Sequence, residues 1–143
     1  MTIALIDDQL LSSVLRGTAP RILAPTELYT TGYWYVRLCQ AVVNATERAG
    51  VRSRPFTELP PDLRERAVRV LLELPVAIGL VSLRDLAPLI GHLRRDHQLN
   101  ILGMEALAAA KHLGADVHLS ASSPLLQDAL RRENINVRIH RSK

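Results

Sequence analysis

Short apolar runs that alternate with stretches of helical periodicity are the feature that most constrains the fold of this chain. The runs lie at residues 2–6 (TIALI), 21–24, 77–81, 117–119 and 135–139. We expect each of them to form a strand that is covered on both faces, as strands are in a parallel sheet.

Helical patterns fill most of the space between these runs. They are expected at residues 9–15, 27–49, 61–74, 82–93, 103–113 and 123–130, with residues 50–60 forming a loop. Asp85 follows Ser82 in a capping-box pattern, and Gly114 fits a helix end. The order of elements predicts a single domain over residues 1–143, a three-layer α/β/α sandwich around a mainly parallel sheet of roughly five strands.

The composition restricts the class of protein. The chain has 143 residues, 48% of them hydrophobic and 22% charged, which suits one globular domain. No apolar run reaches the roughly 18 residues of a membrane span, and the opening MTIALIDDQ does not resemble a signal peptide. Cys39 is the single cysteine, so an internal disulfide is excluded and a cytoplasmic location is expected.

The formal net charge of +4 is concentrated near the end of the sequence. Residues 131–143 hold five basic residues against Glu133, so residues 1–130 are formally neutral. A weaker basic stretch runs from Arg37 to Arg54. Arginine suits phosphate binding, which invites a nucleic-acid interpretation, but a compositional bias of the encoding genome would produce the same surplus.

Two features stand out as candidates for function. Asp7 and Asp8 follow the first predicted strand, where an acid can hold a metal or can cap the next helix. An aromatic cluster follows later, at Tyr29, Tyr33, Trp34 and Tyr35. Its side chains could serve an interface or stack on bases, and could equally pack into the core. No phosphate loop or dinucleotide fingerprint is present.

Three segments together resemble the PIN domain, a nuclease-like fold of toxin–antitoxin ribonucleases. They are residues 3–17 (IALIDDQLLSSVLRG), 81–114 (a helix, a basic stretch with histidine and an Ala-rich helix) and 115–139 (ADVHLSASSPLLQDALRRENINVRI). The resemblance covers nearly the whole chain and implies a cluster of carboxylates at the strand ends. Such a cluster holds Mg²⁺ or Mn²⁺, which activates water and neutralises phosphate charge.

The acidic positions that the resemblance implies are largely lost here. The first falls on Asp7, and the others fall on Thr31, Gly103 and Ser122, none of which is acidic. Our preferred hypothesis is therefore a PIN-like domain with a degenerate active site and no cofactor. It would act as a binding or regulatory module, with a second copy of the chain or an antitoxin-like protein as its partner. The residues expected to line its pocket are Asp7, Gln9, Thr31, Asn100, Ser120 and Ser122.

Two alternatives stay open. The first is an active endoribonuclease that uses Mg²⁺ or Mn²⁺ at a rearranged cluster of Asp7, Asp8, Glu27 and Glu105. In it, the arginines of residues 37–54, Arg37 among them, and those of the C-terminal tail would hold the RNA phosphates. Against it, a two-residue step on a helix turns a side chain by about 200°, so Glu105 is expected to point away from the position of Gly103. The second alternative is an RNA-binding protein without catalysis.

Overall fold

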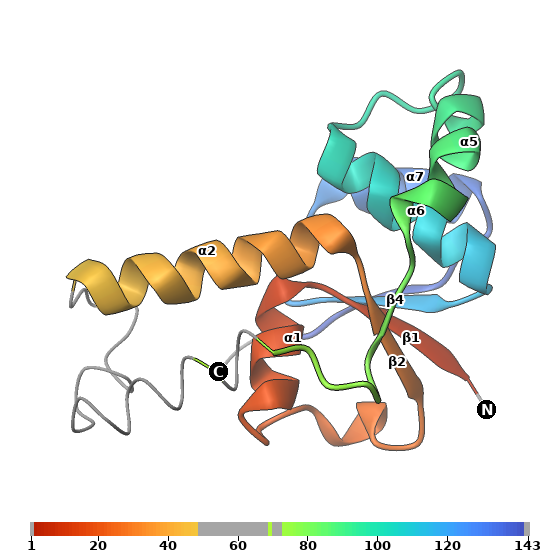
Figure 1. Cartoon of the computed structure of the whole chain (residues 1–143). Helices are drawn as coiled ribbons and strands as arrows, with labels where there is room; N and C mark the ends of the chain where they lie inside the picture. The colour runs from red at the N-terminus through yellow and green to blue at the C-terminus, as the bar shows by residue number, and fades with distance from the viewer. Residues whose placement is uncertain (1, 49–68, 70–72, 142–143) are drawn as a thin grey trace.

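The computed structural model describes residues 2–48, 69 and 73–141, and its centre is a five-stranded sheet (Figure 1). The strands are β1 Ile3–Ile6, β2 Glu27–Thr30, β3 Gly79–Leu80, β4 Asp116–Leu119 and β5 Val137–Ile139. They pair in the order β3-β2-β1-β4-β5, and every pair is parallel. The predicted parallel sheet is thus confirmed.

Helices cover both faces of this sheet and complete the predicted three layers. They are α1 Asp8–Leu15, α2 Gly32–Arg48, α5 Leu83–Leu93, α6 Ile101–Leu113 and α7 Pro124–Arg132. Leu5, Val117 and Leu119 pack with α5, α6 and α7 on one face, whereas Ala4 and Ile6 pack with α1 and α2 on the other. Figure 1 shows α5, α6 and α7 grouped on the opposite side of the sheet from α1. In the part of the chain that the structure describes, no helix could cross a membrane.

The prediction was wrong at two neighbouring places. Residues 21–24 do not form a strand, because Arg21–Leu23 is a turn of 3-10 helix (η1) between Pro20 and Pro25. Proline has no N–H for a strand ladder, so this apolar run could not join the sheet. The strand is instead β2, which aligns Leu28 with Ala4 of β1. The helix that was expected from residue 27 therefore begins at Gly32.

The remaining elements agree with the sequence to within a few residues. Helix α6 begins at Ile101, two residues earlier than expected, because the side chain of Asn100 caps it. Of the predicted helix at 61–74, only residues 69, 73 and 74 are described, and the predicted loop at 50–60 lies outside the described residues.

Strand β5 was expected to be covered on both faces, but one of its faces is exposed. Val137 and Ile139 pack against the core beneath α7, but Arg138 between them is exposed, as is Asn136 just before the strand. This alternation belongs to a strand with one solvated face. The α1 side of the sheet is therefore apolar over β1 and polar over β5.

Gly79 provides a test of the tight contact between β3 and β2. A Cβ atom there would lie 2.2 Å from the Tyr29 ring, so Gly79→Ala forces the ring out of place. We expect the free energy of unfolding to fall by about 1–3 kcal/mol in urea denaturation. The matched control is Gly91→Ala in α5, where a Cβ meets nothing within 4 Å. That change should raise stability by about 0.5–1 kcal/mol, and equal effects of the two substitutions would contradict the packing described.

Candidate functional site

The carboxyl ends of β1, β2 and β4 meet at one edge of the sheet and bring several predicted site residues together. Asp7 follows β1, Thr31 follows β2 and Ser120 follows β4, and β1 lies between the other two strands. In parallel sheets this edge is where ligands usually bind. Glu105 of α6 approaches the same edge from the helical layer.

Asp7 is buried, with 6% of its surface exposed, and both of its carboxylate oxygens accept hydrogen bonds. Oδ1 accepts from the Leu10 N–H at 3.0 Å, which caps α1. Oδ2 accepts from the Ser120 N–H at 2.8 Å and from the Ser120 hydroxyl at 2.7 Å. A carboxylate has about four acceptor positions, so these three donors leave little of it for a ligand. Asp7 joins β1, α1 and the loop after β4.

Asp8, the first residue of α1, lies beside a cation. Its Oδ2 is 3.6 Å from Nε of Arg37, whose side chain is largely exposed. Burial raises the pKa of Asp8, Arg37 opposes that rise, and the neighbouring carboxylate of Asp7 adds to it. When Asp8 is ionised, its partial burial therefore destabilises the folded state.

Glu105 is fully buried and faces the beginning of α2. Its Oε1 accepts a hydrogen bond of 2.8 Å from the Tyr33 N–H, in the first turn of that helix. A Cβ atom on Gly32 would come within 3.1 Å of Oε2, so the glycine makes room for the carboxylate. An acid at a helix N-terminus is stabilised by the free N–H groups and the helix dipole.

Glu105 and Gly103 of α6 face different neighbours: Oε1 of Glu105 accepts from the Tyr33 N–H, whereas a Cβ atom on Gly103 would meet Leu99 and Asn100. Residues 103 to 110 of α6 are all buried, so this helix has no outward side over those turns. Glu105 lies two residues after Gly103 on α6, and its side chain is buried where α2 begins. Glu105 therefore lies inside the molecule and faces the first turn of α2.

The other predicted residues are mostly engaged in local contacts. Thr31 accepts a bond from the Trp34 N–H, Asn100 caps α6 through the Gly103 N–H, and Ser122 donates to Gln127. Gln9 is exposed on α1. The structure does not bring Glu27 to this edge, because it begins β2 opposite Ile3, at the far end of the strand from Asp7.

The donor set at this edge does not fit a Mg²⁺ or Mn²⁺ ion. Such ions need several carboxylate or carbonyl oxygens free to point at one centre. Asp7 accepts hydrogen bonds from two N–H groups and one hydroxyl, and Asp8 faces Arg37. Glu105 binds α2 through Oε1 alone, so its buried Oε2 has no hydrogen-bond partner among the described residues. Within residues 2–48, 69 and 73–141, no three His, Cys, Asp or Glu side chains are grouped so that they could hold a metal.

Of the aromatic cluster, Trp34 belongs to the core, with 3% of its surface exposed. Tyr29 packs partly against the same core, and Tyr35 against the core on the α1 side. The structure also reveals polar side chains that were not singled out: Asp116, His118 and Arg138 on β4 and β5. The signal was the apolar–polar alternation of residues 135–139 (INVRI).

The chain matches no protein-family model, and a search of curated proteins finds no similar sequence.

The hydrogen bonds of Asp7 predict a structural role that is independent of metal. In Asp7→Asn, either orientation of the amide turns its NH₂ group toward an N–H or O–H donor. We expect the free energy of unfolding to fall by about 1–3 kcal/mol, equally in EDTA and in Mg²⁺. Ser120→Ala is the matched control, and it should cost about 1 kcal/mol because the Ser120 N–H bond remains. Stabilisation of the wild type by Mg²⁺ that Asp7→Asn abolishes would contradict this role.

The raised pKa of Asp8 predicts the sign of a pH effect. An acid whose pKa is higher in the folded state favours folding while it is protonated, and this contribution is lost as the pH rises through the folded pKa. Asp8→Asn should therefore raise the melting temperature at pH 7 and leave it unchanged near pH 3, measured by circular dichroism. The control is Asp128→Asn on the exposed side of α7, which should change little at either pH. A lower melting temperature of Asp8→Asn at pH 7 would show that the Arg37 pair dominates.

Proposed function

We propose that this chain is a PIN-like domain that lacks metal-dependent nuclease activity and acts as a binding or regulatory module. The proposal is supported by the all-parallel five-stranded sheet with helices on both faces, and by an aspartate directly after β1. Fold alone does not determine activity, so the chemistry of the carboxyl edge carries the argument.

The hydrogen bonding of Asp7 is the observation that carries the proposal. A nuclease of this kind needs carboxylates with free oxygens, because the metal they hold activates water and neutralises phosphate charge. Here the retained acid binds Leu10 and Ser120 through three hydrogen bonds. Binding a metal would require Asp7 to release contacts that connect β1 with α1 and with the loop after β4.

The other positions of the resemblance add no negative charge. Thr31 is buried under the first turn of α2, and the hydroxyl of Ser122 is 3.0 Å from Gln127 Oε1. At Gly103, a Cβ atom would lie 3.1 Å from Leu99 and 3.2 Å from Asn100 Oδ1, so even a small side chain is crowded. Asp7, Thr31 and Ser122 at this edge already hydrogen-bond within the fold, whereas Oε2 of the buried Glu105 has no partner among the described residues.

A protein partner suits the surroundings of this edge. Three helices begin at this edge, and each has a large, apolar and exposed side chain in its first turn: Leu83 of α5, Ile101 of α6 and Leu125 of α7. Apolar side chains of this kind form the centres of protein interfaces, whereas a surface for RNA would concentrate cations. A second copy of the chain is the simplest such partner.

A ribonuclease assay tests the absence of metal-dependent cleavage. The protein is incubated with single-stranded RNA and Mn²⁺, beside Asp7→Asn and an EDTA control. We expect the wild type, the variant and the EDTA sample to give the same background level of cleavage, because Asp7 does not present a free carboxylate. Cleavage by the wild type that both Asp7→Asn and EDTA abolish would instead support the endoribonuclease alternative.

The same RNA measures the non-catalytic alternative. Binding that weakens steeply between low and physiological salt would indicate phosphate contacts and an RNA-binding role. A protein-binding module should bind the RNA weakly at every salt concentration.

A further inference from the structure

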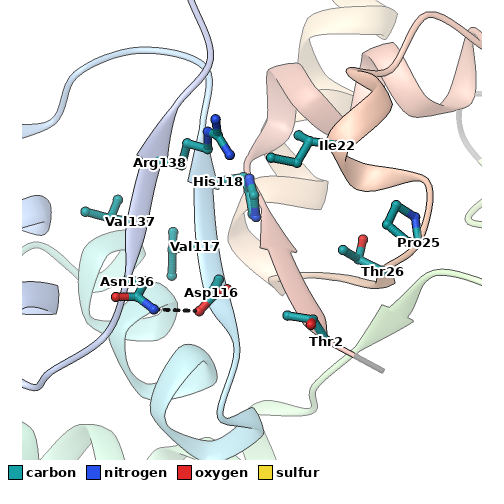
Figure 2. Close-up of a pocket in the computed structure, with 10 residues that line it drawn as sticks. All are labelled: Thr2, Ile22, Pro25, Thr26, Asp116, Val117, His118, Asn136, Val137 and Arg138. Atoms are coloured by element: carbon teal, nitrogen blue, oxygen red, sulfur yellow. Dashed lines mark hydrogen bonds between the residues drawn. The ribbon is translucent and has the colours of Figure 1, made fainter.

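A pocket of about 360 Å³ opens on the α1 side of the sheet, over β4 and β5 and away from the carboxyl edge (Figure 2). Asp116 of β4 and Arg138 of β5 lie toward opposite ends of it, with the buried His118 between them. Asp116 reaches toward β5, since its Oδ1 accepts a hydrogen bond of 3.3 Å from the Asn136 amide. Within the described residues, no ion pair engages Asp116 or Arg138. This face therefore carries an acid and a base that can pair with another molecule.

Strand β5 lies at one end of the sheet, and its outer edge is unpaired in the part of the chain that the structure describes. Toward β4, the Asn136 C=O accepts from the Val117 N–H. Because the backbone groups of successive residues point to opposite sides of a strand, Val137 and Ile139 direct their N–H and C=O groups away from β4. No described residue hydrogen-bonds to these outward groups. Such an edge is a template for a further strand.

The apolar residues of this edge are arranged symmetrically about Val137. Residues 135–139 (INVRI) place one isoleucine two residues before it and another two residues after it. Ile135, Val137 and Ile139 are all partly buried and pack against the core, so they share one face of the sheet. An antiparallel copy of the same strand would therefore set apolar side chains opposite apolar side chains on that face.

The charges favour one register of such a pair, with Val137 opposite its own copy. Asn136 then lies opposite the partner's Arg138, in a pair without hydrogen bonds whose side chains are close together. Each arginine thereby meets the Asp116 carboxylate that is bonded to Asn136, and two-fold symmetry gives two such opposite-charge contacts. A register centred on Arg138 would instead set the two arginines directly against each other.

We propose that two copies of this chain associate through antiparallel β5 strands centred on Val137, which joins their two sheets into one. The N–H and C=O of Val137 would bond those of the partner's Val137, and each Arg138 would pair with the partner's Asp116. The inference goes beyond the proposed function, because it concerns the β5 edge and leaves the carboxyl edge of each copy open.

Charge exchange tests the proposal by sedimentation velocity at about 100 µM protein, a concentration that populates weak dimers. We expect the wild type to contain dimer. Asp116→Arg alone and Arg138→Asp alone should each weaken association at least about tenfold, because each turns opposite charges into like charges. An equimolar mixture of these two variants should recover the dimer, because both contacts between unlike copies then join opposite charges.

The matched controls carry the same changes of charge on another surface. Arg84→Asp and Asp85→Arg, both exposed on α5, should associate as the wild type does. Ile101→Glu at the carboxyl edge should also leave the dimer intact. Circular dichroism spectra check that each variant is folded.

Cysteine crosslinking tests the register without any change of charge. In a Cys39→Ser background, Val137→Cys should form a disulfide between copies, because opposite residues of a hydrogen-bonded pair have Cα atoms about 5.5 Å apart. Ile135→Cys is the control and should not crosslink, because it lies opposite residue 139 of the other copy and far from its own equivalent.

Several outcomes would overturn the proposal. The wild type is monomeric at this concentration, the separate charge variants associate normally, their mixture fails to recover the dimer, Ile101→Glu removes it, or Ile135→Cys crosslinks as well as Val137→Cys. A monomeric protein whose affinity for single-stranded RNA falls in Arg138→Gln would assign this face to RNA instead. None of these outcomes depends on RNA cleavage or on Asp7, so a failure of the proposed function is recognised separately.

Discussion

The carboxylate of Asp7 is the contact on which the rest of the carboxyl edge depends. One oxygen caps α1 by accepting a hydrogen bond from the Leu10 N–H. The other accepts hydrogen bonds from the N–H and the hydroxyl of Ser120, which follows β4. A single buried acid thus joins two neighbouring strands to a helix. Its negative charge is compensated by these donors, as a buried charge requires. The same bonds that stabilise the edge make Asp7 a poor metal ligand.

Coverage of the sheet explains where ligands can approach. The face under α5, α6 and α7 is closed by α6, whose residues 103 to 110 are all buried. On the other face, the apolar side chains of β1 lie under α1 and α2, while Asp116 and the exposed Arg138 line a pocket beside η1, with the buried His118 between them. Among the described residues, polar side chains therefore gather at the carboxyl edge and, separately, on the face of β4 and β5 beside η1.

Much of this fold could be predicted from the sequence, because strand runs and helix caps are local signals. The errors arose where tertiary pairing decides: residues 21–24 look like a strand but are bounded by prolines, and β2 is selected by its alignment with β1. Asp7 was found from its place after β1, although its partner Ser120 is 113 residues away. The contact of Glu105 depends on α2 beginning at Gly32, and no local sequence pattern predicts that start. The alternation of apolar and polar residues at 135–139 was the only sequence signal for the polar face of β5 that lines the pocket.

The central claim, that Asp7 serves the fold rather than a metal, is tested most directly by nuclear magnetic resonance with Mn²⁺. The paramagnetic ion broadens the signals of nearby nuclei, so the amides of Leu10 and Ser120 report on the Asp7 carboxylate. The account predicts that submillimolar Mn²⁺ leaves both signals as sharp as those of amides elsewhere in the sheet. Selective, saturable broadening of these two amides, absent in Asp7→Asn, would contradict it.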